Sequence, residues 1–174
     1  MFLPQFFKER YSDQIYLFSL LLTLLPLVSL AGTFTSGAFT KLFNGSPLLS
    51  IIAVFVFQAV LILINCIYNI GATFLFITSL LILVNSGLIQ GLIFISIPFI
   101  SSNPKDHAHA NGAVSQLGNL GATIGIPIFS ILLVNFNWNV ALLFPAFCCL
   151  IGLIASIIGH KKYSQKHYLL HIER

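Results

Sequence analysis

Five long apolar segments make up most of this chain, and none of them contains an Asp, Glu, Lys or Arg deep in its interior. A helix of about 20 residues, rising about 1.5 Å per residue, crosses a hydrocarbon core about 30 Å thick. The segments also lack the strict alternation of apolar and polar residues that barrel strands show. The sequence therefore predicts an all-α fold, a polytopic transmembrane helix bundle of about five spans. The predicted spans are 14–39, 47–65, 70–100, 111–134 and 139–160, between an N-terminal segment 1–13 and a C-terminal tail 161–174.

The composition agrees with a membrane location. The chain is 57% hydrophobic and 7% charged, with a mean hydropathy of +0.98, whereas soluble domains carry roughly 25% charged residues. The net charge of +4 does not indicate a nucleic-acid partner, because the basic residues lie at segment ends and form no stripe. We expect an integral multi-pass protein in contact with the lipid bilayer, in a bacterial inner (plasma) membrane.

The basic residues also predict an orientation, because cytoplasmic loops carry the excess of Lys and Arg. With five spans, the side that holds the N-terminus carries two basic residues and the other side carries six. The N-terminus is therefore expected outside and the C-terminus in the cytoplasm. The two residues are Lys8 and Arg10; the six are Lys41, Lys105, Lys161, Lys162, Lys166 and Arg174.

Patterns typical of catalysis or metal binding are absent from the sequence. It contains no G-x-S-x-G, H-E-x-x-H or glycine-rich phosphate loop. His107 and His109 are two residues apart and would point away from each other on a helix. Cys66, Cys148 and Cys149 show no metal-ligand spacing, so we expect inert thiols. We predict no enzymatic activity, no metal and no cofactor.

Glycines recur in the third and fourth predicted spans at helical spacing. Gly87 and Gly91 are four residues apart, as are Gly121 and Gly125, and Gly118 falls near the face of the latter pair. In a helix in water each glycine costs about 1 kcal/mol relative to alanine, but in lipid such small residues let two helix backbones approach closely. These five glycines are therefore predicted helix-packing positions.

Side-chain amides inside the spans are the candidates for a substrate path. Lipid penalises such groups, so each must face protein or a polar cavity. Two interpretations stay open for each one: a hydrogen bond between helices, or contact with a solute near the middle of the membrane. Asn65 and Asn69 are expected at the outer membrane surface, where water would hydrate them. The candidates are Asn85, Gln90, Gln116 and Asn119.

The fourth span carries a specific pattern. A-x-A-N-G is followed by Q-L-G-N-L-G-x-x-x-G-x-P, which resembles the eleventh helix of major facilitator superfamily transporters. The last span, from Trp138 to the basic pair Lys161 and Lys162, is similar to the twelfth helix and its cytoplasmic end. By this resemblance the five spans correspond to helices eight to twelve. The residues that carry the pattern are Asn111, Gly112, Gln116, Gly118, Asn119, Gly121, Gly125 and Pro127.

The resemblance implies membrane transport of a small solute by alternating access. Transporters of that superfamily have two six-helix halves with the substrate held between them, so five spans imply a partial C-terminal half, a truncated or split fragment. Its expected partners are a solute and either a missing N-terminal half or another membrane chain. The alternative is a small structural or assembly protein that oligomerises through its glycine-rich helix faces.

Overall fold

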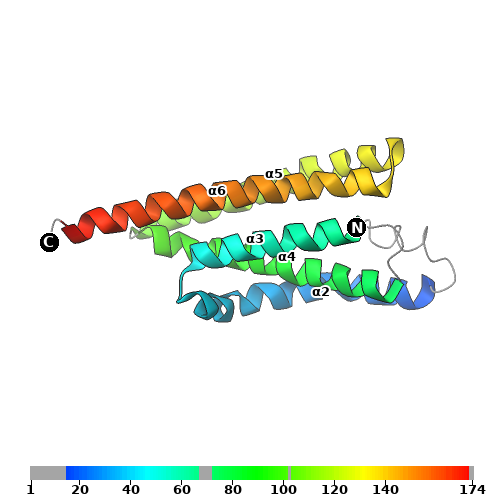
Figure 1. Ribbon diagram of the computed structural model, residues 1–174, viewed down its shortest axis with the longest axis horizontal. Helices are drawn as coiled ribbons and strands as arrows, with labels where there is room; N and C mark the ends of the chain where they lie inside the picture. The colour runs from blue at the N-terminus through cyan, green and yellow to red at the C-terminus, as the bar shows by residue number, and fades with distance from the viewer. Residues whose placement is uncertain (1–14, 67–71, 102, 173–174) are drawn as a thin grey trace.

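Long helices joined by short connections form the structure. The computed structural model describes residues 15–66, 72–101 and 103–172. Its helices are α2 (Ile15–Thr40), α3 (Pro47–Asn65), α4 (Ala72–Ile100), α5 (Pro104–Asn135) and α6 (Trp138–Ile172), with a short 3-10 helix, η2 (Lys41–Phe43). None of the described residues forms a strand, and the predicted all-α helix bundle is confirmed (Figure 1).

Several of these helices are long and apolar enough to cross a membrane. In the described part of the chain, the four that meet both criteria are Pro47–Asn65, Thr73–Ile100, Pro104–Asn135 and Trp138–Gln165. Helix α2 adds 26 residues without a charged side chain, which at about 1.5 Å per residue is also sufficient. The protein is therefore an integral, multi-pass membrane protein.

Two helices extend beyond the apolar segments predicted as spans. Helix α5 begins at Pro104, and α6 continues past His160 to Ile172. The start of α5 follows from local chemistry: the Asn103 side chain accepts a hydrogen bond from the Lys105 backbone N–H at 3.2 Å, and proline suits the first helical position. Hydropathy marks the part of a helix that suits lipid, whereas caps determine where the helix begins.

The reversal between α2 and α3 depends on two residues with positive φ. Asn44 has φ 53° and Gly45 has φ 74°, the left-handed conformation that ends many helices. The Gly45 N–H donates to the Thr40 carbonyl at 2.9 Å. Ser46 then caps α3, which has Pro47 at its first turn. The chain therefore turns back within a few residues and places α3 antiparallel to α2.

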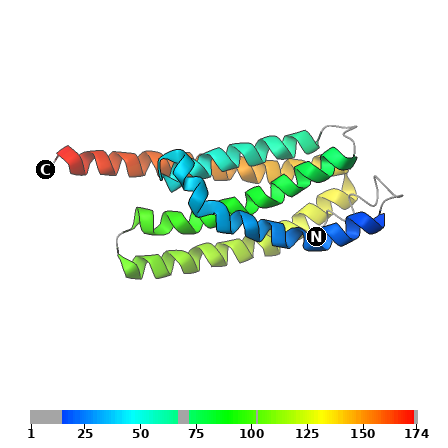
Figure 2. The ribbon, with the colours of Figure 1, turned by 90° about the horizontal axis from the view of Figure 1, so that it is seen from below.

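Helices α2 and α4 pack closely through glycines on both sides, and they lie side by side in Figures 1 and 2. A Cβ added to Gly87 would overlap the Ser29 carbonyl oxygen, and one added to Gly32 would overlap the Val84 carbonyl oxygen. A Cβ at Gly91 would overlap the side chain and backbone of α2 in the same way. Backbones approach this closely only where no side chain separates them.

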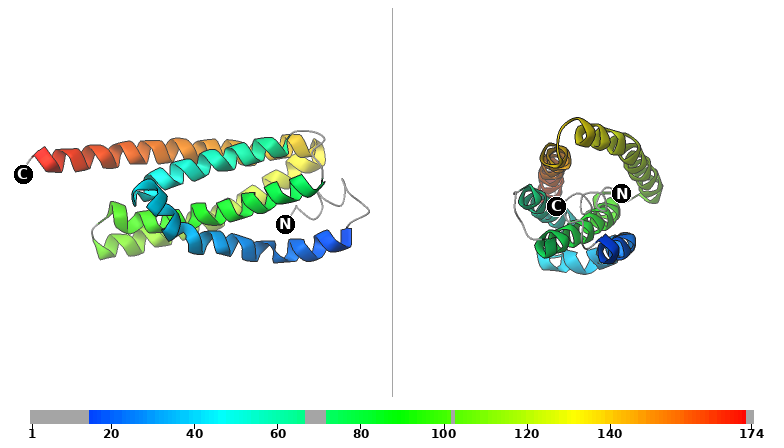
Figure 3. Two further views of the ribbon diagram at one scale, coloured as in Figure 1. Left: turned by 60° about the horizontal axis from the view of Figure 1, so that its bottom comes forward. Right: turned by 90° about the vertical axis from the view of Figure 1, so that its right-hand side faces the viewer.

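Helix α3 lies between α4 and α6, as the end-on view in Figure 3 shows. Its Ile51 and Val54 form a buried cluster with Leu92 of α4. On its other side, Phe55 lies against Gly152 of α6, where an added Cβ would come within 2.6 Å of the ring carbon Cε1. The core of the bundle is therefore built by α2, α3, α4 and α6.

Helix α5 stands apart from this core. It contacts α4 and α6, but none of its residues is buried. At Gly118, Gly121 and Gly125 an added Cβ would have no neighbour within 4 Å among the described residues. The close helix contacts predicted at these three glycines are therefore not made within the described chain, unlike those at Gly87 and Gly91.

Candidate functional site

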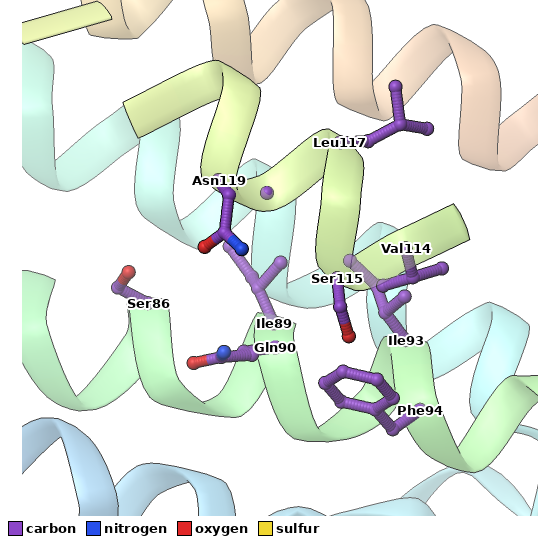
Figure 4. A pocket seen from close by; sticks show the side chains of 10 residues that line it. Ser86, Ile89, Gln90, Ile93, Phe94, Val114, Ser115, Leu117 and Asn119 are labelled. Carbon is purple, nitrogen blue, oxygen red and sulfur yellow. The ribbon is translucent and has the colours of Figure 1, made fainter. Parts of the chain in front are cut away.

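A cleft of about 780 Å³ lies between α4 and α5. This volume is within the range of about 300–1,000 Å³ typical of small-molecule sites. Both helices contribute polar and apolar side chains to its walls (Figure 4). The lining residues are Ser86, Ile89, Gln90, Ile93 and Phe94 from α4, and Val114, Ser115, Leu117, Gly118 and Asn119 from α5.

Four polar side chains of the cleft form two pairs at helical spacing. Ser86 and Gln90 are four residues apart on α4, and Ser115 and Asn119 are four apart on α5, so each pair shares one helix face. Figure 4 shows the side chains of Ser115 and Asn119 directed from α5 toward α4, whereas Leu117 points to the other side of α5. The cleft therefore has hydrogen-bonding groups on two facing walls.

These four side chains have no hydrogen-bond partner among the described residues, and all four are exposed. The amides of Gln90 and Asn119 each carry two N–H donors and an acceptor oxygen, and each serine hydroxyl is both donor and acceptor. In a membrane protein, unsatisfied groups of this kind require water, a ligand or another chain. Among the described residues, the cleft is therefore a candidate solute-binding site.

Asn85, a predicted candidate, lies elsewhere. Its side chain is 3% exposed and is directed to α3, where Nδ2 donates to Gln58 Oε1 at 2.7 Å and to the Val54 carbonyl at 2.9 Å. Both donors of the amide are therefore used within the protein. Of the two interpretations left open for Asn85, the structure favours the hydrogen bond between helices.

Asn65 is a second interhelical amide, and the expectation that water would hydrate it was wrong. It is 4% exposed, accepts a hydrogen bond from Thr78 Oγ1 of α4 at 2.9 Å and donates from Nδ2 to the Leu61 carbonyl at 2.7 Å. The packing of α4 against the end of α3 buries it. Asn69 lies outside the described residues.

Gln116 does not line the cleft, although it is adjacent to Ser115 in sequence. Successive residues of an α-helix are about 100° apart around its axis, so Gln116 occupies a different face of α5, where it is exposed. The structure thus brings Gln90 and Asn119 to one cleft and leaves Asn85 and Gln116 out of it.

The family model of the Major Facilitator Superfamily matches residues 1–169. The chain belongs to the major facilitator superfamily. The predicted family is confirmed, and with it the assignment of the chain to membrane transport, because members of this superfamily are transporters. No curated protein and no solved structure matches the chain.

The position of the cleft suits a superfamily transporter, whose substrate site lies near the bilayer midplane. Asn119 is 15 residues from the first residue of α5 and 16 from the last. Gln90 is 18 residues from the start of α4 and 10 from its end. At about 1.5 Å per residue, Asn119 lies about 22 Å and Gln90 about 15 Å from the nearer helix end.

The cleft offers hydrogen bonds but no ionised group. None of its ten lining residues is Asp, Glu, Lys, Arg or His. Among the described residues no three His, Cys, Asp or Glu side chains come together as a metal site would require. His107, near the start of α5, lies with Nε2 2.6 Å from the Ser101 carbonyl, and so connects the adjacent ends of α4 and α5.

Sequence reasoning missed the two serines of the cleft. Serine is frequent in this chain, and the candidates for the substrate path are all amides. The available signal was their spacing, because each lies four residues before a candidate amide, Gln90 or Asn119. Polar residues at i and i+4 in a membrane helix indicate a polar stripe on one face.

Proposed function

We propose that this chain forms part of a transporter that moves a small solute by alternating access, with the cleft between α4 and α5 as one wall of the solute path. The observation that carries the proposal is the unpaired state of Gln90 and Asn119 on facing helices. Buried amides elsewhere in the protein, such as Asn65 and Asn85, are hydrogen-bonded within it. A solute is a suitable partner for amides left free inside two spans.

We also propose that the chain works with a second membrane segment, namely the other half of a superfamily transporter. In such transporters the site lies between two six-helix halves, whereas the described helices number five. Helix α5 supports this proposal, because none of its residues is buried and a Cβ added at Gly118, Gly121 or Gly125 would meet nothing within 4 Å among the described residues. A chain that acts as a fragment or split product would have such a face.

Uptake and efflux in cells of the source organism test the transport proposal. Deletion of the gene should reduce the movement of at least one solute, and the wild-type gene should restore it. Gln90→Leu and Asn119→Leu should each reduce the restored rate at least about tenfold, since each removes an amide from the cleft. Gln116→Leu is the matched control, because Gln116 is an exposed amide of α5 outside the cleft. Equal activity of all three variants would contradict the proposed site.

Cross-linking tests whether α5 contacts a second membrane protein. Ala122 lies on the face of Gly118 and Gly125 and is exposed. Ala122→Cys, in a tagged chain whose native cysteines are replaced, should be cross-linked by a bifunctional maleimide in native membranes to a different membrane protein. A product of two identical chains would favour the alternative, a protein that assembles through its glycine-rich faces. Solute uptake by the purified chain alone in proteoliposomes would contradict its status as a fragment.

A further inference from the structure

The cleft between α4 and α5 lies in a part of the chain without fixed charge. No Asp, Glu, Lys or Arg occurs between Lys41 and Lys105, or between Asp106 and Lys161. These two intervals contain the whole of α3 and α4, and α5 from His107 onward. None of the described residues that line the cleft can therefore neutralise a charged solute.

A charged solute would be costly to hold in such a site. Removing an ion from water into a protein interior costs several kcal/mol even after relaxation, unless an opposite charge compensates it. Amides and hydroxyls offset only part of this desolvation cost. A neutral polar group is different, because a hydrogen bond replaces the one that it made with water.

The types of hydrogen-bonding group lead to the same conclusion. Gln90 and Asn119 each offer donors and an acceptor, and so do Ser86 and Ser115. An anion would use only the donors and leave the acceptor oxygens unpaired, and a cation would do the reverse. Hydroxyl and amide groups of a solute donate and accept at once, so they can satisfy both kinds.

The apolar part of the cleft adds a second requirement. Ile89, Ile93 and Phe94 of α4 and Val114 of α5 line it together with the polar groups (Figure 4). A fitting solute therefore has carbon surface as well as hydrogen-bonding groups. Small ring compounds and short chains with several hydroxyl or amide groups have both.

We propose that the cleft binds an uncharged solute that carries hydroxyl or amide groups. This proposal rests on the proposed transport function and specifies its substrate class. Gln90 and Asn119 hold the polar groups of the solute from opposite walls, and Ser86 and Ser115 extend each wall by one helical turn.

A mixture of neutral solutes and their charged counterparts tests the proposal. Cells with the gene deleted, and deleted cells carrying the wild-type gene, receive isotope-labelled glucose, mannitol and uridine together with glucosamine, gluconate and uridine monophosphate. Mass spectrometry follows uptake and efflux of all six. We expect the wild-type gene to change the movement of at least one neutral solute at least about fivefold, and that of its charged counterpart less than twofold.

The outcomes separate the two proposals. A gene-dependent movement of charged solutes alone would overturn the neutral substrate class and leave the transport function in place. If the gene affects none of the six solutes, the neutral substrate class fails, and the deletion experiment described above decides the transport function. Movement of the neutral members alone supports both.

Charged variants of the same size provide a second test. Asn119→Asp and Gln90→Glu retain the shape of the side chain and add a negative charge to the cleft. We expect each to reduce movement of the neutral solute at least about tenfold at unchanged abundance in the membrane. Gln116→Glu, outside the cleft, should reduce it less than twofold. An effect of Gln116→Glu as large as that of the other two would overturn the assignment to the cleft.

Discussion

Asn85 of α4 donates a hydrogen bond of 2.7 Å from Nδ2 to Oε1 of Gln58 on α3, and both side chains are buried. The Asn85 amide also donates a hydrogen bond to the Val54 carbonyl, which belongs to α3 as well. Gln90, five residues further along α4, has no such partner among the described residues and faces the cleft. Five residues correspond to about 500° around a helix axis, which is one full turn plus about 140°. The two amides therefore lie on different faces of α4. Their different neighbours give them different roles.

The pair formed by Asn85 and Gln58 should contribute measurably to stability. Asn85→Leu removes both bonds and leaves the Gln58 oxygen without its donor in a buried site. Hydrogen bonds between membrane helices contribute about 0.6 kcal/mol on average and up to about 1.7 kcal/mol, and an orphaned buried group adds about 1–3 kcal/mol. We expect a loss of about 1–3 kcal/mol in the free energy of unfolding, measured by titration with sodium dodecyl sulfate in mixed micelles.

A double-mutant cycle isolates the interaction. Gln58→Leu combined with Asn85→Leu removes both partners, so the double variant should be less destabilised than the sum of the two single variants. Gln116→Leu, at an exposed position, should change the free energy of unfolding by less than about 0.5 kcal/mol. Strict additivity of the two single variants would show that the bond contributes nothing.

Gly87 and Gly121 should respond differently to the same substitution. At Gly87 an added side chain would overlap the Ser29 carbonyl of α2, whereas at Gly121 it would meet nothing within 4 Å among the described residues. Gly87→Leu should therefore separate α2 from α4 and cost about 1–3 kcal/mol or more. Gly121→Leu should leave the purified chain as stable as the wild type. The stabilities of both variants are compared by thermal unfolding in the same detergent.

In native membranes, Gly121→Leu should weaken the contact between α5 and its partner. If α5 packs against the other half of a transporter through its glycines, a leucine there blocks close approach. We expect the yield of the cross-link from Ala122→Cys to fall at least about fivefold when Gly121→Leu is added. An unchanged yield would mean that the partner contacts α5 elsewhere.

The contrast between these glycines shows what the sequence could predict and what it could not. Spacing identified Gly87 and Gly121 equally well, because helical periodicity assigns a residue to a face. It does not say which helix covers that face. Gly87 meets the Ser29 backbone of α2, whereas a Cβ added at Gly121 of α5 would meet no other helix within 4 Å among the described residues.

The same limit applies to the candidate site. The number and approximate position of the helices followed from hydropathy, and the family followed from the fourth span. Asn85 and Gln90 look alike in the sequence, as polar groups in an apolar segment, although one is bonded to Gln58 and the other faces the cleft. Asn65 was misjudged because its partner, Thr78, belongs to another helix. Local sequence shows that an amide needs a partner but does not identify the partner.

A cysteine in the cleft should react preferentially with uncharged reagents. In a chain with the native cysteines replaced, Ser115→Cys places a thiol in the wall of the cleft without adding charge. We expect the neutral reagent hydroxyethyl methanethiosulfonate to modify it at least about tenfold faster than the ethylammonium and ethylsulfonate reagents of similar size. Rates at Ala108→Cys, exposed near the start of α5, correct for the intrinsic reactivity of each reagent. Equal corrected rates would contradict an uncharged cleft.

Cys66 can report the orientation of the protein and the environment at the end of α3. It follows Asn65, the last residue of that helix, on the side that the distribution of basic residues assigns to the outside. Burial raises the pKa of its thiol, because desolvation disfavours the thiolate. The thiolate is the form that reacts with maleimide, so labelling should be slow at neutral pH. Its rate should rise about tenfold per pH unit and continue to rise beyond about 8.5, the usual thiol pKa.

The measurement uses intact cells and a maleimide that cannot cross the membrane. With Cys148 and Cys149 replaced by alanine, Cys66 should be labelled without permeabilisation. In a second chain that lacks all three native cysteines, Ser164→Cys, exposed in the last part of α6, should be labelled only after permeabilisation. The reverse pattern would invert the predicted topology. A rate at Cys66 that levels off at or below pH 8.5 would show that the thiol is fully hydrated, and that the end of α3 is less covered than the packing around Asn65 indicates.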